Sequence, residues 1–280
     1  MNTDDFLRFM DGPNSQARII EEYNSIVSTQ EEEIRHRPTK KLKINGCFSY
    51  LQCLFNGPQF NDSMIPEASF VDGYETERKF ICTKNPREKD CEMFWQTVWD
   101  NEVEVIVMTC KLTDESYQYW SPKEGYILAS KKFKIKTRRI FINSHYTLTL
   151  LFLTASELKL KPMRMIYHYQ YTAWPRSKFP HQLDAFIDFY CFVNDTHVKL
   201  ANRVTDKKFP PTLVHCLDGL GSSQVFCAFD ICITQFNRTG ILSLPDVFKK
   251  MLKLKHGSMV NHSDLYVLCY QLVKAYLDEI

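Results

Sequence analysis

The sequence predicts a mixed protein of strands and helices, of the α/β or α+β class. Residues 147–153 and 163–171 alternate apolar and polar side chains with a period of two, which is typical of sheet strands. Residues 92–99 instead place their apolar side chains on one side of a helix. With 280 residues the chain can bury a large core, so a single domain spanning residues 1–280 is expected.

The beginning of the chain is predicted to hold one amphipathic helix after a short extension, residues 1–14. Residues 15–27 follow the helical repeat, and the apolar face comprises Ile19, Ile20, Tyr23, Ile26 and Val27. Ser15 is the expected N-cap. The charged segment 31–43 follows, and a solvated linker explains it better than a site for an acidic partner.

The middle of the chain is predicted to alternate between buried and half-exposed elements. Phe94, Trp95, Val98 and Trp99 form one helical stripe, which core packing explains without any cofactor. A buried strand, residues 103–108, comes next. In the basic run 131–139 lysines alternate with apolar residues, so a half-exposed strand is favoured over a nucleic-acid site.

The last part of the chain is predicted to hold three helices. Residues 224–233 form an apolar helix, and another begins at Pro245 and ends at Gly257. Ser263 is expected to cap a C-terminal helix. The buried face of that helix comprises Leu265, Leu268, Cys269, Leu272, Val273, Tyr276 and Leu277.

Composition excludes several classes of function. A net charge of +2 gives no general argument for binding nucleic acid or a membrane surface. No secretory signal and no segment long enough to span a bilayer is recognisable, so a cytoplasmic location is expected. The ten cysteines have irregular spacing without a Cys-x-x-Cys pair, which favours reduced thiols over a disulfide framework or a metal site. No cofactor is expected.

Residues 211–223 hold the group that indicates a reaction. An apolar strand ends at His215-Cys216, and a loop containing Gly219 and Gly221 leads into a helix. A cysteine in this setting is typical of a nucleophilic thiol, and the N–H groups of such a loop bind oxyanions such as phosphate. This pattern resembles the signature loop of the protein tyrosine phosphatase family, His-Cys-x5-Arg-Ser/Thr. The loop then comprises His215, Cys216, Leu217, Asp218, Gly219, Leu220, Gly221, Ser222 and Ser223.

Five positions depart from the residues that the family uses for hydrolysis. Ser222 occupies the motif position of the arginine that binds the phosphate oxygens in that family. In the Trp-Pro-Asp loop, Trp174 and Pro175 match, but Arg176 replaces the aspartate that acts as the acid. Cys47 occupies the motif position of the tyrosine that stacks on the substrate ring in that family. In the segment that positions the water, which includes His262, the two glutamines are replaced by Asn261 and Leu265.

The resemblance covers about residues 15–280 and implies a tyrosine phosphatase fold, a twisted mixed sheet with helices on both faces. The many altered motif positions are similar to those of tyrosine-phosphatase-like proteins of polydnaviruses, particularly bracoviruses. That likeness implies a non-enzymatic protein that binds or sequesters signalling proteins of an insect host. Whether these partners carry phosphotyrosine, and the oligomeric state, stay open.

The substitutions predict a pseudophosphatase. Cys216 remains as the nucleophile position, but Ser222 cannot replace a bidentate cation, and Arg176 cannot act as an acid at neutral pH. Asp218 adds a carboxylate that should raise the thiol pKa and repel phosphate. Two roles for Arg176 remain open: it binds phosphate in place of the lost arginine, or, as is favoured, it pairs with Asp218. The alternative function is a residual or redirected phosphatase that uses Cys216.

Overall fold

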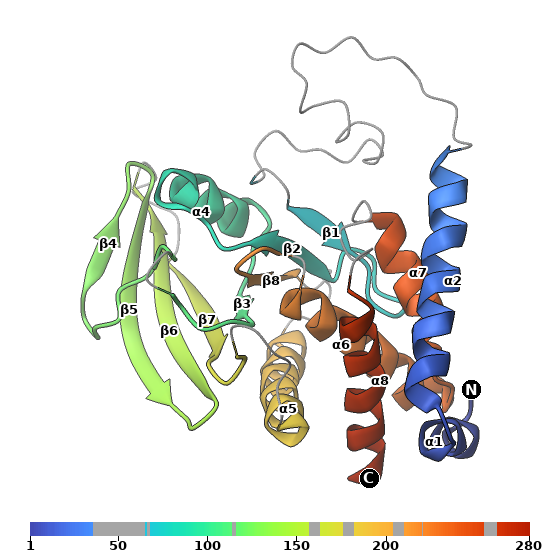
Figure 1. Ribbon diagram of the computed structural model, residues 1–280. Coiled ribbons are helices and arrows are strands. Elements are labelled where there is room, and N and C mark those ends of the chain that lie inside the picture. Colours follow the sequence, from blue (N-terminus) through green and yellow to red (C-terminus); the bar gives the residue numbers. More distant parts are fainter. Residues whose placement is uncertain are drawn as a thin grey trace. The chain divides into compact units, whose positions relative to one another are not determined.

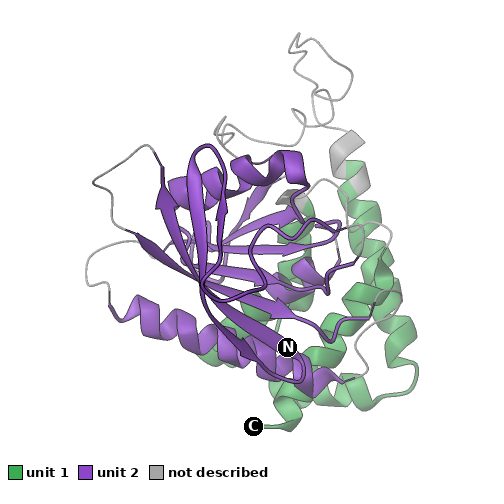
Figure 2. Cartoon of the chain, turned by 90° about the vertical axis from the view of Figure 1, so that its left-hand side faces the viewer, with its two compact units in different colours: residues 1–62, 228–280 green, residues 63–227 purple. Residues whose placement is uncertain are grey.

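The computed structural model describes residues 1–35, 65, 68–113, 116–156, 163–175, 182–203, 210–219, 221–254 and 262–280. The chain divides into two compact units, which Figure 2 colours separately. The sheet unit is Ser63–Cys227, and the helical unit combines Met1–Asp62 with Ala228–Ile280. Each unit is described by itself.

The sheet unit is built on an eight-stranded mixed sheet of order β1-β2-β8-β3-β7-β6-β5-β4. The central strands β2, β8, β3 and β7 run parallel to one another, whereas the other neighbours are antiparallel. The bounds are β1 Ser69–Val71, β2 Phe80–Lys84, β3 Val105–Met108, β4 Ile127–Ala129, β5 Phe133–Ile142, β6 Tyr146–Ala155, β7 Arg164–Tyr171 and β8 Thr212–Cys216. The predicted strands over 147–153, 163–171 and 103–108 are therefore confirmed.

Helices of the sheet unit cover both faces of the sheet (Figure 1). On one face α4 (Cys91–Asp100), which follows the 3-10 turn η1 (Glu88–Asp90), packs the predicted Phe94 stripe into the main core. On the other face α5 (Leu183–Ala201) places Phe186 and Phe189 against Tyr171 of β7. The first turns of α6 (Ser222–Thr239) join this layer through Phe226. The mixed class with helices on both faces is confirmed.

Strand β5 confirms the interpretation of the basic run. Its side chains alternate between buried Phe133, Ile135 and Thr137 and exposed lysines at 134 and 136. The register shifts between Thr137 and Arg139, and beyond this bulge the strand is largely exposed. The lysines therefore lie on the solvated face of a half-buried strand.

The helical unit contains α1 (Thr3–Asp11), α2 (Ser15–Arg35), the rest of α6, α7 (Leu244–Leu254) and α8 (Ser263–Asp278). The carboxylate of Glu22 on α2 accepts hydrogen bonds from Tyr266 at 2.5 Å and Tyr270 at 2.6 Å, both on α8. The predicted buried face of α8 is confirmed except at Tyr276, which is half-buried. Helix α1 lies in the segment that was expected only to be an extension.

Three details of the helix ends were predicted wrongly. Helix α2 continues to Arg35, so residues 31–35 are helical rather than part of a linker. This extension contains glutamates, isoleucine and arginine without glycine or proline, so nothing in its composition ends the helix. Ser15 and Ser263 are first helical residues rather than caps: the carbonyl of Asn14 accepts the first hydrogen bond of α2, and His262 is the N-cap of α8. Gly257 lies outside the described residues.

No helix in the described ranges is both long and apolar enough to cross a membrane.

Candidate functional site

The phosphate-loop segment begins at the centre of the sheet. Strand β8 lies between β2 and β3, and its five residues are all buried. The loop is fixed on both sides, because Asn85 N–H donates to the Cys216 carbonyl at 2.7 Å and Thr109 N–H donates to the His215 carbonyl at 2.9 Å. Cys216 therefore lies at the carboxyl ends of parallel strands, where open α/β sheets bind their ligands.

Gly219 allows the loop to pass close to β2. Its φ of +75° is in the left-handed region, and a Cβ at this position would lie 2.9 Å from Lys84 N and 3.0 Å from the Thr83 carbonyl oxygen. Only glycine meets both conditions without displacing backbone. The retained glycine preserves the course of the loop.

The Cys216 thiol is held in its protonated form. Its side chain is buried, the Sγ–H donates to Asp218 Oδ1 at 3.2 Å, and Sγ lies 3.1 Å from Ser223 Oγ. Burial raises the pKa of the thiol, and the Asp218 carboxylate raises it further, while the Ser223 hydroxyl acts in the opposite direction. The expected direction is found, although burial contributes more than the carboxylate. A thiol with a raised pKa is a weak nucleophile at neutral pH.

Asp218 is exposed and accepts two hydrogen bonds from within the loop. Its Oδ1 accepts a hydrogen bond from Gly221 N–H at 3.3 Å as well as from the thiol of Cys216. Loop amides in such a turn bind anions because several N–H groups point inward. Here a carboxylate from the loop itself takes one of these amides.

The Ser222 side chain is directed to Thr109, the residue that follows β3. Its Oγ lies 2.8 Å from Thr109 Oγ1, and Thr109 in turn donates its proton to the His215 carbonyl, so the Ser222 hydroxyl donates to Thr109. The Ser222 side chain is buried. No residue from 215 to 223 is an arginine or lysine, so the loop offers no cation to phosphate.

Beside the loop lies a hollow of about 590 Å³. Its lining includes the cationic side chains of Lys84 and Arg87, and also Leu217 of the loop. Arg87 in this hollow pairs with Asp90, with Nε 2.7 Å from Oδ2. The lining residues are Lys84, Asn85, Pro86, Arg87, Glu88, Thr113, Ser116, Tyr117 and Leu217. Cys216 is not among them.

A buried group of three side chains supports the loop from below. The Tyr119 hydroxyl lies 2.6 Å from His215 Nε2 and 2.7 Å from His168 Nε2. Since a phenol has one proton, it donates to one ring and accepts from the other. Burial lowers the pKa of each histidine to about 3, so both rings are neutral. The network fixes the His215 ring and thereby the start of the loop.

The other predicted site residues are described only in part. Trp174 is half-buried, and its ring lies 5.9 Å from that of Phe186. In the helical unit Leu265 is buried, and the His262 N–H donates to the Tyr23 hydroxyl at 3.1 Å. Pro175 is half-buried and is the last residue of a described range. Cys47, Arg176, Leu220 and Asn261 lie outside the described residues.

Three hydrogen bonds of the site were not predicted. The Asp218–Gly221 and Asp218–Cys216 hydrogen bonds depend on the loop conformation, although an aspartate two residues after a cysteine in a glycine-containing turn is a usable signal. The Ser222–Thr109 bond joins residues far apart in the sequence. Among the described residues no cluster of three His, Cys, Asp or Glu side chains could hold a metal ion.

Comparisons with known proteins agree on one family. The protein-tyrosine phosphatase family model matches residues 58–275. "Probable tyrosine phosphatase protein J2" of Microplitis demolitor bracovirus is 33% identical over 98% of this chain and 93% of that protein. "Tyrosine phosphatase-like protein J3" of the same virus is 34% identical over 71% of this chain and 81% of that protein.

A solved structure extends the likeness to three dimensions. It is described as the structural basis of the PTPN18 fingerprint on distinct HER2 tyrosine phosphorylation sites. The match has a TM-score of 0.61 and 26% identity, and it covers 74% of this chain and 71% of the other.

Proposed function

Since the chain belongs to the protein-tyrosine phosphatase family, we propose that it is a pseudophosphatase that acts by binding proteins. One observation carries this proposal. The loop that binds phosphate in this family holds the chain's own Asp218 carboxylate, which accepts from the Cys216 thiol and the Gly221 amide. A dianionic phosphate would meet a like charge at this place, and no cation of the loop would offset it.

The residues at the reacting positions support the same conclusion. The thiol has a raised pKa, so little thiolate is present to attack phosphorus. Loss of general acid catalysis at Arg176 lowers a rate by roughly 10²–10⁴-fold. Loss of a transition-state charge partner at Ser222 costs roughly 10²–10³-fold. The two losses need not multiply, but either leaves activity on phosphotyrosine near background.

The partners that we propose are signalling proteins of an insect host, met in the host cytoplasm. The bracovirus names of similar proteins support this setting. Of the two roles for Arg176, pairing with Asp218 is favoured over binding phosphate. The hydrogen bonds that Asp218 already makes support a closed loop, that is, a phosphate loop in which the chain's own carboxylate excludes phosphate.

A second function, hydrolysis that depends on Cys216, has one observation in its favour. The Ser223 hydroxyl lies 3.1 Å from Sγ and lowers the thiol pKa. This effect is smaller than those of burial and Asp218, so we rank hydrolysis below binding.

Titration with a phosphotyrosine peptide separates the two roles of Arg176. A closed loop predicts no binding to the wild-type protein, and measurable binding to Asp218→Ala. If Arg176 held phosphate, the wild-type protein would bind the peptide and Arg176→Ala would not.

Capture from host-cell lysate, with and without prior phosphatase treatment, tests the proposed partners. We expect the same proteins on wild-type and Cys216→Ser baits, whether or not the lysate was dephosphorylated. A lysate in which no protein binds the wild-type bait above a bait unfolded before coupling would contradict the proposal.

A further inference from the structure

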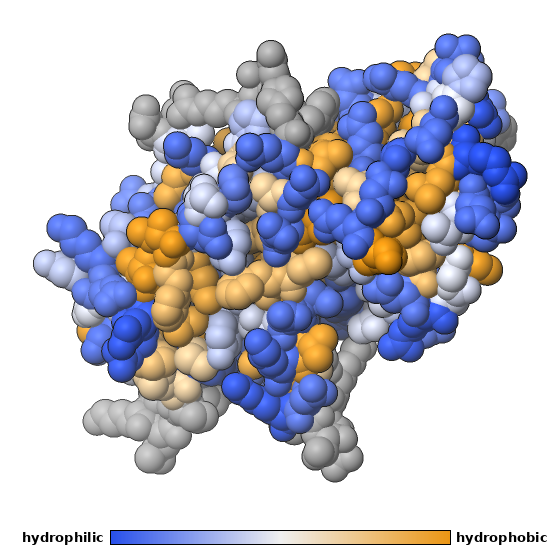
Figure 3. All heavy atoms as spheres, turned by 90° about the horizontal axis from the view of Figure 1, so that it is seen from below, coloured by the Kyte–Doolittle hydropathy of each residue, from blue (hydrophilic) through white to orange (hydrophobic). Residues whose placement is uncertain are grey.

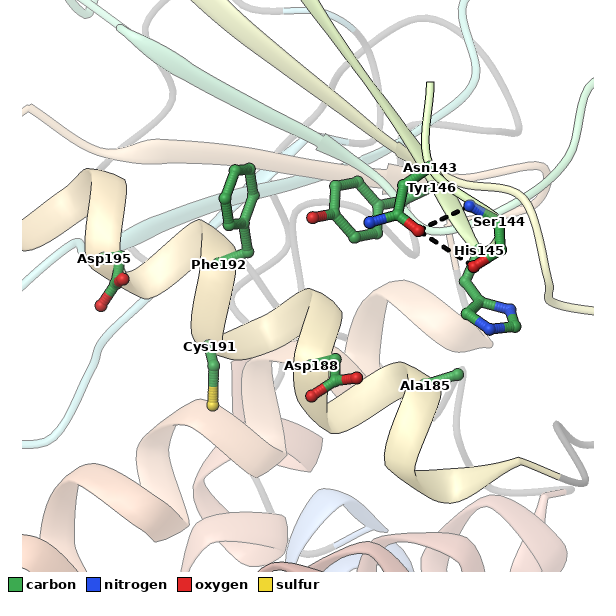
Figure 4. Close-up of a pocket in the computed structure, with 9 residues that line it drawn as sticks. All are labelled: Asn143, Ser144, His145, Tyr146, Ala185, Asp188, Cys191, Phe192 and Asp195. Atoms are coloured by element: carbon green, nitrogen blue, oxygen red, sulfur yellow. Dashed lines mark hydrogen bonds between the residues drawn. The ribbon is translucent and has the colours of Figure 1, made fainter. Parts of the chain in front are cut away.

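A cleft of the sheet unit, lined by no residue of the phosphate loop, combines aromatic rings with carboxylates. It has a volume of about 430 Å³ and lies between the β5–β6 turn and α5 (Figure 4). The turn is held by Asn143, whose Oδ1 accepts from Ser144 N–H at 2.6 Å and from Ser144 Oγ at 2.9 Å. The cleft is lined by Asn143, Ser144, His145, Tyr146, Ala185, Asp188, Cys191, Phe192 and Asp195.

The aromatic wall of the cleft is formed by Tyr146 and Phe192. Their ring centroids are 5.3 Å apart with an angle of 36° between the planes, and Figure 4 shows the Tyr146 ring reaching from the turn toward the Phe192 ring. The Phe192 side chain is large and apolar, yet it is 42% exposed. Exposed apolar side chains also occur elsewhere, as the orange patches in Figure 3 show. At this wall, however, the exposed Phe192 ring lies next to charged side chains.

The charge comes from Asp188 and Asp195 on α5. Figure 4 shows them projecting from the helix on either side of Phe192. Both are exposed, and within the described ranges neither forms an ion pair or a hydrogen bond. No lysine or arginine lines the cleft, so its charge is negative.

We propose that this cleft binds an arginine side chain of a partner protein. A guanidinium is planar, stacks on aromatic faces and donates to carboxylates, so it uses both kinds of group present here. A single metal ion would not be bound by Asp188 and Asp195 together. Seven residues along a helix separate them by roughly 10 Å, whereas bonds from Ca²⁺ to oxygen are about 2.3–2.6 Å.

The proposal goes beyond the pseudophosphatase function and is independent of it. Its groups all come from residues 143–146 and 185–195, and none belongs to the phosphate loop. It would stand even if Cys216 proved to be catalytic, and it would fail without affecting the state of that loop.

Cys191 gives a direct readout of occupancy. It lines the cleft and is exposed, whereas the other cysteines in the described ranges are buried or half-buried. The alkylation rate of Cys191, followed by mass spectrometry of its peptide, can be measured with N-acetyl-arginine methylamide at increasing millimolar concentration. The same series with the citrulline analogue, which has the same shape without the charge, is the ligand control.

We expect arginine methylamide to slow alkylation of Cys191 in a saturable way, with an affinity about tenfold higher than that of the citrulline analogue. Asp188→Asn and Asp195→Asn should each weaken binding by about threefold to fivefold, the range of a partly exposed ion pair. Asp184→Asn, on the same helix but outside the cleft, should bind as the wild-type protein does. A seven-residue peptide with a central arginine should bind more tightly than the single residue.

Equal protection by arginine and citrulline, or no protection by either, would overturn the proposal. So would an Asp184→Asn variant that weakens binding as much as Asp188→Asn, because the effect would then be general charge rather than the cleft. Since the three variants change exposed side chains, circular dichroism can confirm that each remains folded.

Discussion

Asp218 is the residue that most changes the chemistry of this loop. The same carboxylate accepts one hydrogen bond from the Cys216 thiol and another from a loop amide. The negative charge of Asp218 favours the neutral form of the thiol. The same carboxylate takes one loop amide that could otherwise donate to an anion. The loss of the arginine at Ser222 and the gain of Asp218 therefore act in the same direction.

Two variants should move the pKa of Cys216 in opposite directions. Asp218→Asn removes a like charge and should lower the thiol pKa, although burial will keep it raised. Ser223→Ala removes the hydroxyl that lowers the pKa and should raise it. The pH dependence of Cys216 alkylation measures both. Shifts in the same direction for the two variants would contradict the assigned contacts.

The sequence predicts which residues of the site are altered, but it does not predict their contacts. Ser222, Arg176 and Asp218 can be identified because the flanking His215-Cys216 and Trp174-Pro175 fix the alignment. The direction in which Ser222 turns could not be predicted, because its partner Thr109 is 113 residues away in the sequence, directly after β3.

At the scale of elements, the β2–β8 pair determines which residues the loop tolerates. Gly219→Ala should destabilise the protein by about 1–2 kcal/mol for its positive φ, and by about a further 1–3 kcal/mol because the new Cβ meets Lys84 and Thr83. Gly125 is the matched control, since its φ is +80° and nothing lies within 4 Å of its Cβ position.

Urea unfolding of the two variants measures this difference. We expect Gly125→Ala to lose only the conformational part. Equal losses for the two variants would show that the loop can move away from β2.

In the helical unit, Glu22 joins α2 to α8. Glu22→Gln replaces a charged acceptor of two phenol hydroxyls, so we expect the free energy of unfolding to fall by about 1–3 kcal/mol. Glu21→Gln changes the exposed neighbour and serves as control. Equal unfolding midpoints for the two variants would mean that these hydrogen bonds contribute no net stability.

Elements were predictable where burial is periodic. The α4 stripe, the alternation in β5 and the buried face of α8 all follow from side chains that must leave water. The end of α2 could not be predicted, because a run of charged helix formers has no apolar face to show where the helix stops. The three-residue edge strands β1 and β4 were also missed, since such short segments carry no usable period.

At the scale of the whole molecule, histidines whose pKa is lowered in the folded protein should make folding sensitive to acid. Burial lowers the pKa of His168, His197 and His215 to about 3. The unfolded chain takes up protons on these rings below about pH 6.5, whereas the folded chain does not until about pH 3. Stability should therefore fall as the pH decreases through this window, by up to about 1.4 kcal/mol per pH unit for each histidine.

Urea unfolding at about pH 7 and about pH 5 measures this dependence. His197→Gln removes one of the three rings at a position away from the loop, so its pH dependence should be about a third smaller. Stability that does not change between these pH values would contradict neutral, buried histidines.

The most direct test of a loop occupied by its own carboxylate is turnover of an aryl phosphate. The wild-type protein and Cys216→Ser should release phenol at the same background rate. Ser222→Arg alone should not restore activity, because Asp218 and Arg176 remain. Turnover by the wild-type protein that Cys216→Ser abolishes would contradict the account, and the protein would then be a working phosphatase.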